Sequence, residues 1–165
     1  MRYFFDTEFI ESGRDHPIEI ISIGMVAEDG RELYIERADV PWHLADQWVL
    51  DNVKPHLHME HRKSIEAMRL AILNFIADGY ERPEFWAFFA DYDWVVLCGL
   101  FGKMIDLPSG WPRYCRDLKQ EADRLGAPRN QQPKQSGTEH HALADARWNR
   151  EMYQWLRDWQ VAPDA

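Results

Sequence analysis

The chain has 165 residues, 45% of them hydrophobic, with 8 Trp, 6 Tyr and 8 Phe. This length and composition predict a single domain over residues 1–165 with one sizeable core. Eighteen consecutive apolar residues occur nowhere, so no transmembrane helix is expected. The formal net charge of −9 argues against a broad nucleic-acid-binding surface that depends on counterion release, although it allows an enzyme that grips only a strand end.

The N-terminus and the cysteines indicate a cytoplasmic protein. The segment from Met1 reaches an acid at Asp6, too soon for a secretory signal. Cys98 and Cys115 lie in apolar surroundings without metal-ligand spacing. We therefore expect two buried free thiols in a reducing compartment.

The first part of the chain predicts an antiparallel meander. Residues Arg2–Ile10 alternate in the manner of a strand, and Ile18–Ala27 is a second β-rich run. Glu28-Asp29-Gly30 supplies a turn into a third strand over Glu32–Ile35. In the first strand two sets of side chains point to opposite faces: Tyr3, Phe5, Thr7 and Phe9 on one, and Phe4, Asp6, Glu8 and Ile10 on the other.

The rest of the chain alternates helix and strand. After a crossover with a short helix near Leu44–Asn52, apolar residues recur at helical spacing from Ser64 until Gly79 stops the run. Glu84–Phe89 predicts a central buried strand. The remaining expected elements are a helix with Val96, Leu97, Leu100, Phe101 and Met104 inward, a fifth strand over Pro112–Leu118, a mobile loop over Arg124–Gly137, and a last helix over Ala142–Trp159.

This order predicts an α/β fold. Three antiparallel strands are followed by parallel ones, which gives a mixed five-stranded sheet with helices on both faces. The segment 113–134 also carries a local excess of basic residues that could track phosphates or form a solvated face; its basic residues are Arg113, Arg116, Lys119, Arg124, Arg129 and Lys134.

Asp6 and Glu8 stand two residues apart on the first strand. Their carboxylates leave the same face, about 7 Å apart along the chain, together with the apolar Phe4 and Ile10. Two desolvated like charges on a packed face cost several kcal/mol unless a cation is present. The pair therefore predicts a metal site; the alternative is an edge strand with a wet face.

The last helix adds a third carboxylate and a histidine. Asp145 shares the inward stripe with Trp148 and Met152; a salt-bridged core aspartate is the alternative. His140 precedes it by five residues, about 140° around an ideal helix, which places His140 at the junction of loop and helix. Histidine titrates near neutrality and suits proton abstraction from water. The adjacent His141 is a rival for that role.

Asp93 opens the helix that follows the buried strand. Aspartate is a favoured N-cap, so Asp91 and Asp93 have an ordinary structural explanation. The functional interpretation of Asp93 depends on its coincidence with the other acidic segments, because sites assemble at the C-terminal ends of parallel strands.

Two other clusters suggest different functions. A zinc site is disfavoured because no cysteine accompanies the histidines and their spacing matches no usual site; these histidines are His43, His56, His58 and His61. The tryptophans of the last helix, Trp148, Trp155 and Trp159, could form a nucleobase platform. Trp148 and Trp159 are better explained as core residues, with one face of the helix completing a homodimer interface.

The ordered set of motifs resembles the DEDDh 3′→5′ exonucleases. The motifs are Asp6-x-Glu8 on the first strand, Asp93 with Leu97 four residues later, and His140-x4-Asp145 near the end. Within that superfamily the chain is most similar to the bacterial 3′-5′ exoribonuclease AS family. The doubled histidine is a departure, and only His140 has the spacing of the family.

The resemblance implies an RNase H-like fold and a two-metal-ion reaction. Asp6 would bridge two Mg²⁺ or Mn²⁺ ions, Glu8 and Asp145 would bind the first, and Asp93 the second. His140 would act as general base, releasing nucleoside 5′-monophosphates from the 3′ ends of single-stranded, adenosine-rich RNA. Phe9 is the candidate for stacking on the terminal base, and Thr7 for contacting the terminal sugar.

Two alternatives stay open on the residues alone. Nothing in the sequence reads the 2′-hydroxyl, so a DNA exonuclease of the same fold is the runner-up. A nucleic-acid-binding scaffold that has lost catalysis is the other, although all five groups expected for catalysis are present.

Overall fold

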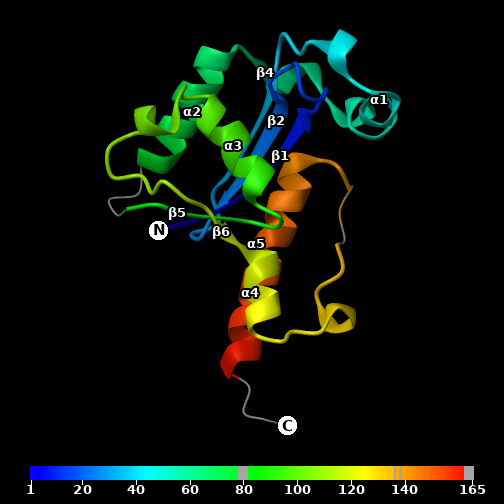
Figure 1. The fold of residues 1–165 in the computed structure, drawn as a ribbon. Coiled ribbons are helices and arrows are strands. Elements are labelled where there is room, and N and C mark those ends of the chain that lie inside the picture. Colours follow the sequence, from blue (N-terminus) through cyan, green and yellow to red (C-terminus); the bar gives the residue numbers. More distant parts are fainter. Residues whose placement is uncertain (78–81, 136, 138, 162–165) are drawn as a thin grey trace.

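The computed structural model describes residues 1–77, 82–135, 137 and 139–161, which form a mixed sheet covered by helices on both faces (Figure 1). The six strands have the order β4-β3-β2-β1-β5-β6. They are β1 (Arg2–Ile10), β2 (Glu19–Ala27), β3 (Glu32–Arg37), β4 (Arg62–Lys63), β5 (Glu84–Ala87) and β6 (Arg116–Asp117). The helices are α1 (Gln47–Asn52), α2 (Ile65–Ala77), α3 (Asp91–Gly99), α4 (Leu118–Arg124) and α5 (Ala142–Val161), with 3₁₀ turns at Trp42–Leu44, Lys54–His56, Met59–His61, Met104–Asp106 and Arg129–Gln131.

The predicted α/β architecture is confirmed. Strands β1, β2 and β3 form the antiparallel meander, and β5 and β6 continue the sheet in parallel with β1. The sheet has six strands instead of the expected five. The additional strand, β4, has two residues and pairs in parallel with the end of β3, which is too short a segment to leave an alternating pattern in the sequence.

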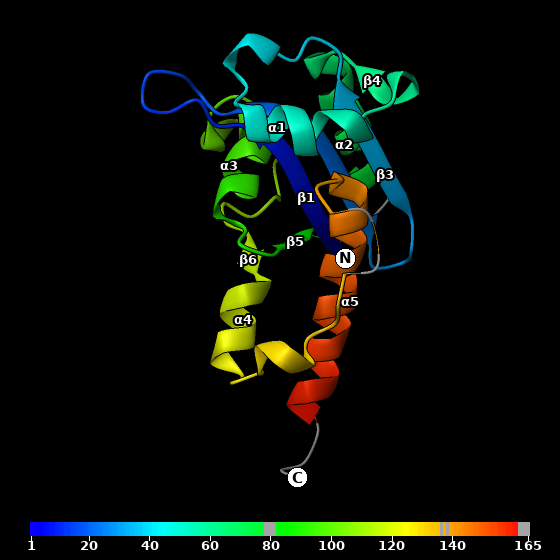
Figure 2. The ribbon, with the colours of Figure 1, turned by 90° about the vertical axis from the view of Figure 1, so that its right-hand side faces the viewer.

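The two faces of β1 are covered by different helices, as its alternation predicts (Figures 1 and 2). Tyr3 and Phe5 join the core shared with α2 and α3. Phe4 joins the core shared with α4 and α5, and Ile10 packs with residues of α1. The strand is therefore buried on both sides, and Asp6 and Glu8 lie on the α5 side of the sheet.

The strands at the β5 edge are shorter than expected. β5 ends at Ala87 rather than at Phe89, because Phe89 takes a positive φ of 55° that leaves the strand conformation. β6 contains only Arg116–Asp117 instead of Pro112–Leu118. Asp117 ends it by accepting hydrogen bonds from Ala90 N (2.6 Å) and from Gln120 N (2.7 Å), and the second bond begins α4, a helix that the sequence pattern did not predict.

Smaller expectations had mixed outcomes. Gly79 lies outside the described residues, and α2 is described as far as Ala77. Met104 is wrongly predicted as an inward residue of α3, because the helix ends at Gly99 and Met104 is exposed. Both cysteines are free; Cys98 is buried and Cys115 is partly buried. No described helix combines the length and the hydropathy that a membrane span requires.

The tryptophans of α5 are less buried than expected. Trp148 and Trp155 are partly buried beside the core shared with α4, and Trp148 meets Phe88 edge to face at 4.9 Å between ring centroids. Trp159 is also partly exposed and pairs with Trp155 at 5.3 Å. The packing of Trp148 fits its interpretation as a core residue. Trp159 does not join this core, because α5 extends past the end of the sheet and its last turns have less to pack against.

Candidate active site

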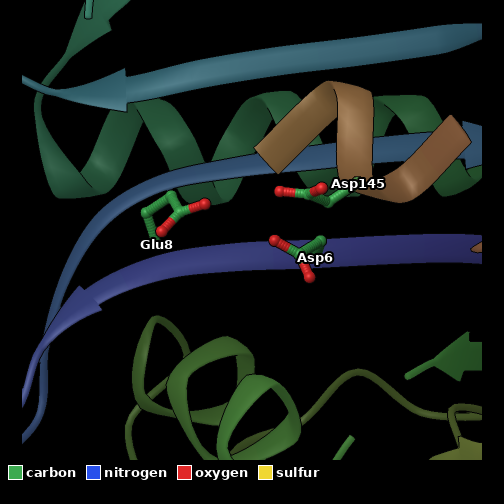
Figure 3. A group of neighbouring side chains, drawn as sticks. All are labelled: Asp6, Glu8 and Asp145. Atoms are coloured by element: carbon green, nitrogen blue, oxygen red, sulfur yellow. The ribbon is translucent and has the colours of Figure 1, made fainter. Parts of the chain in front are cut away.

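Three carboxylates meet between β1 and the first turns of α5. Asp6 and Glu8 rise from β1 toward Asp145 (Figure 3). One carboxylate oxygen from each side chain lies within 4.8 Å of the other two, and among the described residues no other set of at least three acidic, histidine or cysteine side chains meets this criterion. Residues from opposite ends of the chain thus form one acidic cluster.

The close approach of α5 to the sheet depends on small residues. Gly24 on β2 pairs with Asp6, and a Cβ atom on Gly24 would lie 2.3 Å from backbone atoms of Ala142 and Leu143. Ala142 is fully buried. Since only a glycine leaves space for the helix backbone here, this contact sets the distance between Asp145 and the carboxylates of β1.

Asn149 fixes the same helix one turn further on. Its side-chain amide, which is 1% exposed, donates a 2.9 Å hydrogen bond to the carbonyl of Phe5. Asn149 is not among the residues predicted from the sequence, although a polar residue four positions after Asp145 on the inward stripe is a usable signal. Gln135, also not selected, donates a hydrogen bond to Asp145 Oδ1.

Asp93 faces β1 rather than capping its own helix. The N-cap of α3 is Ala90, without a side-chain cap, so the N-cap explanation for Asp91 and Asp93 is wrong. Asp93 is 6% exposed, and its Oδ1 accepts hydrogen bonds from Thr7 N (2.8 Å) and Thr7 Oγ1 (2.6 Å). Thr7 thereby orients Asp93.

The two adjacent histidines have different surroundings. His140 has a positive φ of 61°, lines the same cavity as the carboxylates, and meets Trp48 edge to face at 4.7 Å between centroids. His141 does not line the cavity: it stacks on Tyr34 at 4.4 Å, and its Nδ1 accepts from Ala144 N (3.4 Å) at the start of α5. This geometry favours His140 over His141 as a group that can act in the cavity.

Burial raises the pKa values of all four carboxyl groups, and repulsion within the cluster adds to it at Asp6, Glu8 and Asp93. Burial, followed by the charges of Asp93, Glu8 and Asp145, raises the pKa of Asp6 well above its usual range. Burial first, and then the charges of Asp145 and Asp93, raise the pKa of Glu8 to about 8. Burial raises the pKa of Asp93 to about 6 against the hydrogen bonds from Thr7, and it raises the pKa of Asp145 against the bond from Gln135 and the charge of His140. A bound cation would relieve this cost.

The cavity holds all seven residues selected from the sequence. Its volume is about 450 Å³, and Asp6, Thr7, Glu8, Phe9, Asp93, His140 and Asp145 contribute to its lining. Its rim is aromatic, which the sequence analysis anticipated only for Phe9 and, as an alternative, Trp148. Phe9 stacks on Tyr92 with rings 5.7 Å apart and nearly parallel. The exposed Phe89 (64%) meets Phe88 on the other side.

The rival clusters have other structural explanations. Tyr34 and His61 meet edge to face at 5.0 Å, and the backbone of His58 donates to the buried Glu36. His43 and His58 are exposed, and within the described chain the histidines of this segment do not form a metal-binding group.

The donor set suits hard divalent cations. Carboxylate oxygens are the ligands that Mg²⁺ and Mn²⁺ prefer, and a histidine and an aromatic rim beside them suit hydrolysis of a substrate with stackable bases. The sequence profile of the Rv2179c-like 3′-5′ exoribonuclease domain matches residues 1–156. Two relatives from Mycobacterium tuberculosis, 3′-5′ exoribonuclease Rv2179c of strain H37Rv and 3′-5′ exoribonuclease MT2234.1 of strain CDC 1551, are each 44% identical to the chain over 151 residues, which cover 89% of this chain and 88% of each relative.

Proposed function

The chain belongs to the Rv2179c-like 3′-5′ exoribonuclease family, and from this we propose that it removes nucleoside 5′-monophosphates from the 3′ ends of single-stranded RNA. The observation that carries the proposal is the acidic cluster of Asp6, Glu8 and Asp145 beside His140 in one aromatic-rimmed cavity. We assign the chain to the DEDDh, RNase H-like exonucleases on its motif order and mixed sheet.

The carboxylates would hold two Mg²⁺ or Mn²⁺ ions. Asp6, Glu8 and Asp145 offer oxygens close enough for one ion. Asp6 and the second oxygen of Asp93 are the donors for the other. The bound ions would polarise the scissile phosphate and lower the pKa of the attacking water. The raised pKa values of Asp6 and Glu8 support this assignment, because four crowded carboxylates need a counter-charge.

His140 is the proposed general base. Its ring lines the cavity, and its charge lowers the pKa of Asp145, so the two side chains interact. His140 would take the proton of the attacking water, while Trp48 limits the swing of the imidazole from the α1 side. A positive φ at a residue other than glycine is strained, and such strain clusters at functional sites.

The aromatic rim would hold the unpaired bases. Phe9, stacked on Tyr92, is the proposed platform for the terminal base, and the hydroxyl oxygen of Thr7 is the proposed contact for the terminal sugar. Such platforms favour single strands because bases in a duplex are already stacked. The preference for adenosine-rich ends is carried over from the family resemblance.

The cellular context completes the proposal. Free Cys98 and Cys115 fit a cytoplasmic protein, since disulfides are rare in reducing compartments.

The half-buried pair of Trp155 and Trp159 on α5 is the proposed homodimer contact. Light scattering on the purified protein tests this contact, and a monomer at micromolar concentration would exclude it.

One assay tests the reaction. Labelled poly(A), poly(U) and DNA strands of equal length are incubated with Mn²⁺ or with EDTA, and the products are resolved. We expect 5′-monophosphates released stepwise from the RNA 3′ end, only with Mn²⁺, and an Asp6→Asn variant without activity. Equal or faster DNA cleavage would replace the RNA assignment with a DNA exonuclease. Absence of release together with no effect of Asp6→Asn would favour a silent scaffold.

A further inference from the structure

A second cavity lies at the opposite end of β5 from the acidic cluster. Its volume is about 490 Å³, and it is lined by Arg82, Pro83, Glu84, Phe85, Gly110, Trp111, Pro112, Tyr114 and Arg116. A cavity of this size is in the range of ligand-binding pockets. It forms where β5 extends beyond β6, since β6 pairs only with Trp86 and Ala87, and Glu84 and Phe85 at the beginning of β5 line the cavity.

We propose that this cavity binds a nucleotide of the RNA strand upstream of the one being removed. The proposal rests on the proposed exoribonuclease function and adds a second substrate contact to it. Tyr114 and Trp111 would stack on a base, and Arg116 would pair with a phosphate. The segment that supplies these residues begins the basic stretch noted in the sequence, on a chain whose net charge is −9.

Arg116 is held ready for such a contact. Its guanidinium carbon lies 5.5 Å from the ring centroid of Trp86 and 6.0 Å from that of Tyr114, so two aromatic side chains restrict it. Its ion pair with Glu84 is long, with Nε 3.6 Å from Oε2, and both side chains are more than 40% exposed. Exposed pairs of this kind contribute little stability, so a phosphate would displace the pair at small cost.

Tyr114 is the exposed half of the platform. It is 59% exposed, so its ring is accessible to a ligand. Trp111 on the other side packs against Phe85 at 5.0 Å and Phe101 at 5.2 Å between centroids, so it is anchored in the core. A fixed tryptophan, an accessible tyrosine and a guanidinium are the groups that bind single-stranded RNA without reading its sequence.

The strand β5 connects the two cavities. Phe85 lines the second cavity, and Phe88 and Phe89 line the catalytic cavity. At a rise of about 3.3 Å per residue of extended chain, the step from Phe85 to Phe88, in the turn after β5, spans at most roughly 10 Å. An RNA strand of a few nucleotides is therefore long enough to span from one cavity to the other.

Substrate length separates this contact from catalysis. KM and kcat are measured for a dinucleotide and a hexanucleotide of the same RNA sequence with wild type, Tyr114→Ala and Arg116→Ala. We expect each substitution to raise the KM of the hexanucleotide about tenfold, within the range for losing one stacked base, while kcat and the dinucleotide KM stay unchanged. Tyr114→Phe should retain binding, and Arg69→Ala, at an exposed arginine of α2, is the matched control.

A binding measurement keeps the inference independent of activity. Fluorescence anisotropy of a labelled hexanucleotide is measured with the Asp6→Asn variant and with the Asp6→Asn/Tyr114→Ala double variant. The double variant should have the higher Kd. An unchanged hexanucleotide KM and Kd in both variants, or an equal loss for the dinucleotide, would overturn the second contact. If wild type released no nucleotide, the proposed function would fail, and the anisotropy result would still decide whether this cavity binds RNA.

Discussion

Neutralising Glu8 should stabilise the metal-free protein while it stops catalysis. The surroundings of Glu8 raise its pKa from 4.5 to about 8. Below pH 4.5 the carboxyl group is protonated in both the folded and the unfolded chain, so its burial costs no ionisation energy. Between pH 4.5 and 8 the unfolded chain loses the proton and the folded protein keeps it, so the free energy of unfolding falls as the pH rises.

The size of this effect follows from the pKa. Each pKa unit corresponds to 1.36 kcal/mol, so at pH 8 the metal-free protein loses on the order of 4 kcal/mol through Glu8. For a domain of this size that amounts to roughly 10 °C in Tm. A Glu8→Gln variant has no charge to bury, so its Tm at pH 8 should exceed that of metal-free wild type by this amount, and the two should agree near pH 4.5.

Calorimetry in EDTA from pH 4.5 to 8.5 provides the measurement. Glu60→Gln, at an exposed carboxylate away from the cavity, is the control and should follow wild type. Adding Mn²⁺ at pH 8 should raise the Tm of wild type much more than that of Glu8→Gln, because the ion binds the folded state. Parallel Tm curves for wild type and Glu8→Gln would refute the idea that the acidic cluster is desolvated.

The remaining predictions concern the groups that build the site. His140→Ala should lower kcat by about 10²–10⁴, the usual contribution of a general base, while His141→Ala should have a smaller effect; equal losses in single-turnover assays would remove the distinction between them. Gly24→Ala should push α5 away from β2, because its Cβ would lie 2.3 Å from the Ala142 backbone, lowering the free energy of unfolding by about 1–3 kcal/mol or more and weakening Mn²⁺ binding; unchanged denaturant midpoint and metal affinity would contradict this. Asn149→Ala should cost about 1–3 kcal/mol, because it leaves the carbonyl of Phe5 without its partner, and a chemical denaturation curve that overlays wild type would exclude that role.

Local patterns predicted the parts of the site that one element carries. The alternation of β1 placed Asp6 and Glu8 on the face toward α5, and the apolar stripe of α5 placed Asp145 inward. The role of Asp93 could not be predicted in this way, because an acidic residue in the first turn of a helix is usually interpreted as an N-cap. The hydrogen bonds that Thr7 donates to Asp93 come from a different element. Gly24 was also missed, because the helix backbone that requires a glycine there comes from a remote part of the chain.

The end of β6 shows the other limit. Pro112–Leu118 has the composition of a strand, but Asp117 bonds both Ala90 and the start of α4. The Asp117 side chain accepts hydrogen bonds from two backbone groups, one before α3 and one in α4, and the strand ends at this residue. Neighbouring residues in the sequence contain no sign of that second partner.

The hydrogen bond from Asn149 to Phe5 joins residues 144 positions apart, and it lies within one turn of the acidic cluster. During translation, β1 therefore leaves the ribosome long before the helix that completes the site. A nascent or truncated chain that lacks α5 has two of the three clustered carboxylates and lacks Asn149, which ties the helix to β1. We therefore expect a nuclease assembled in this order to stay inactive beside its own messenger RNA until synthesis is almost finished.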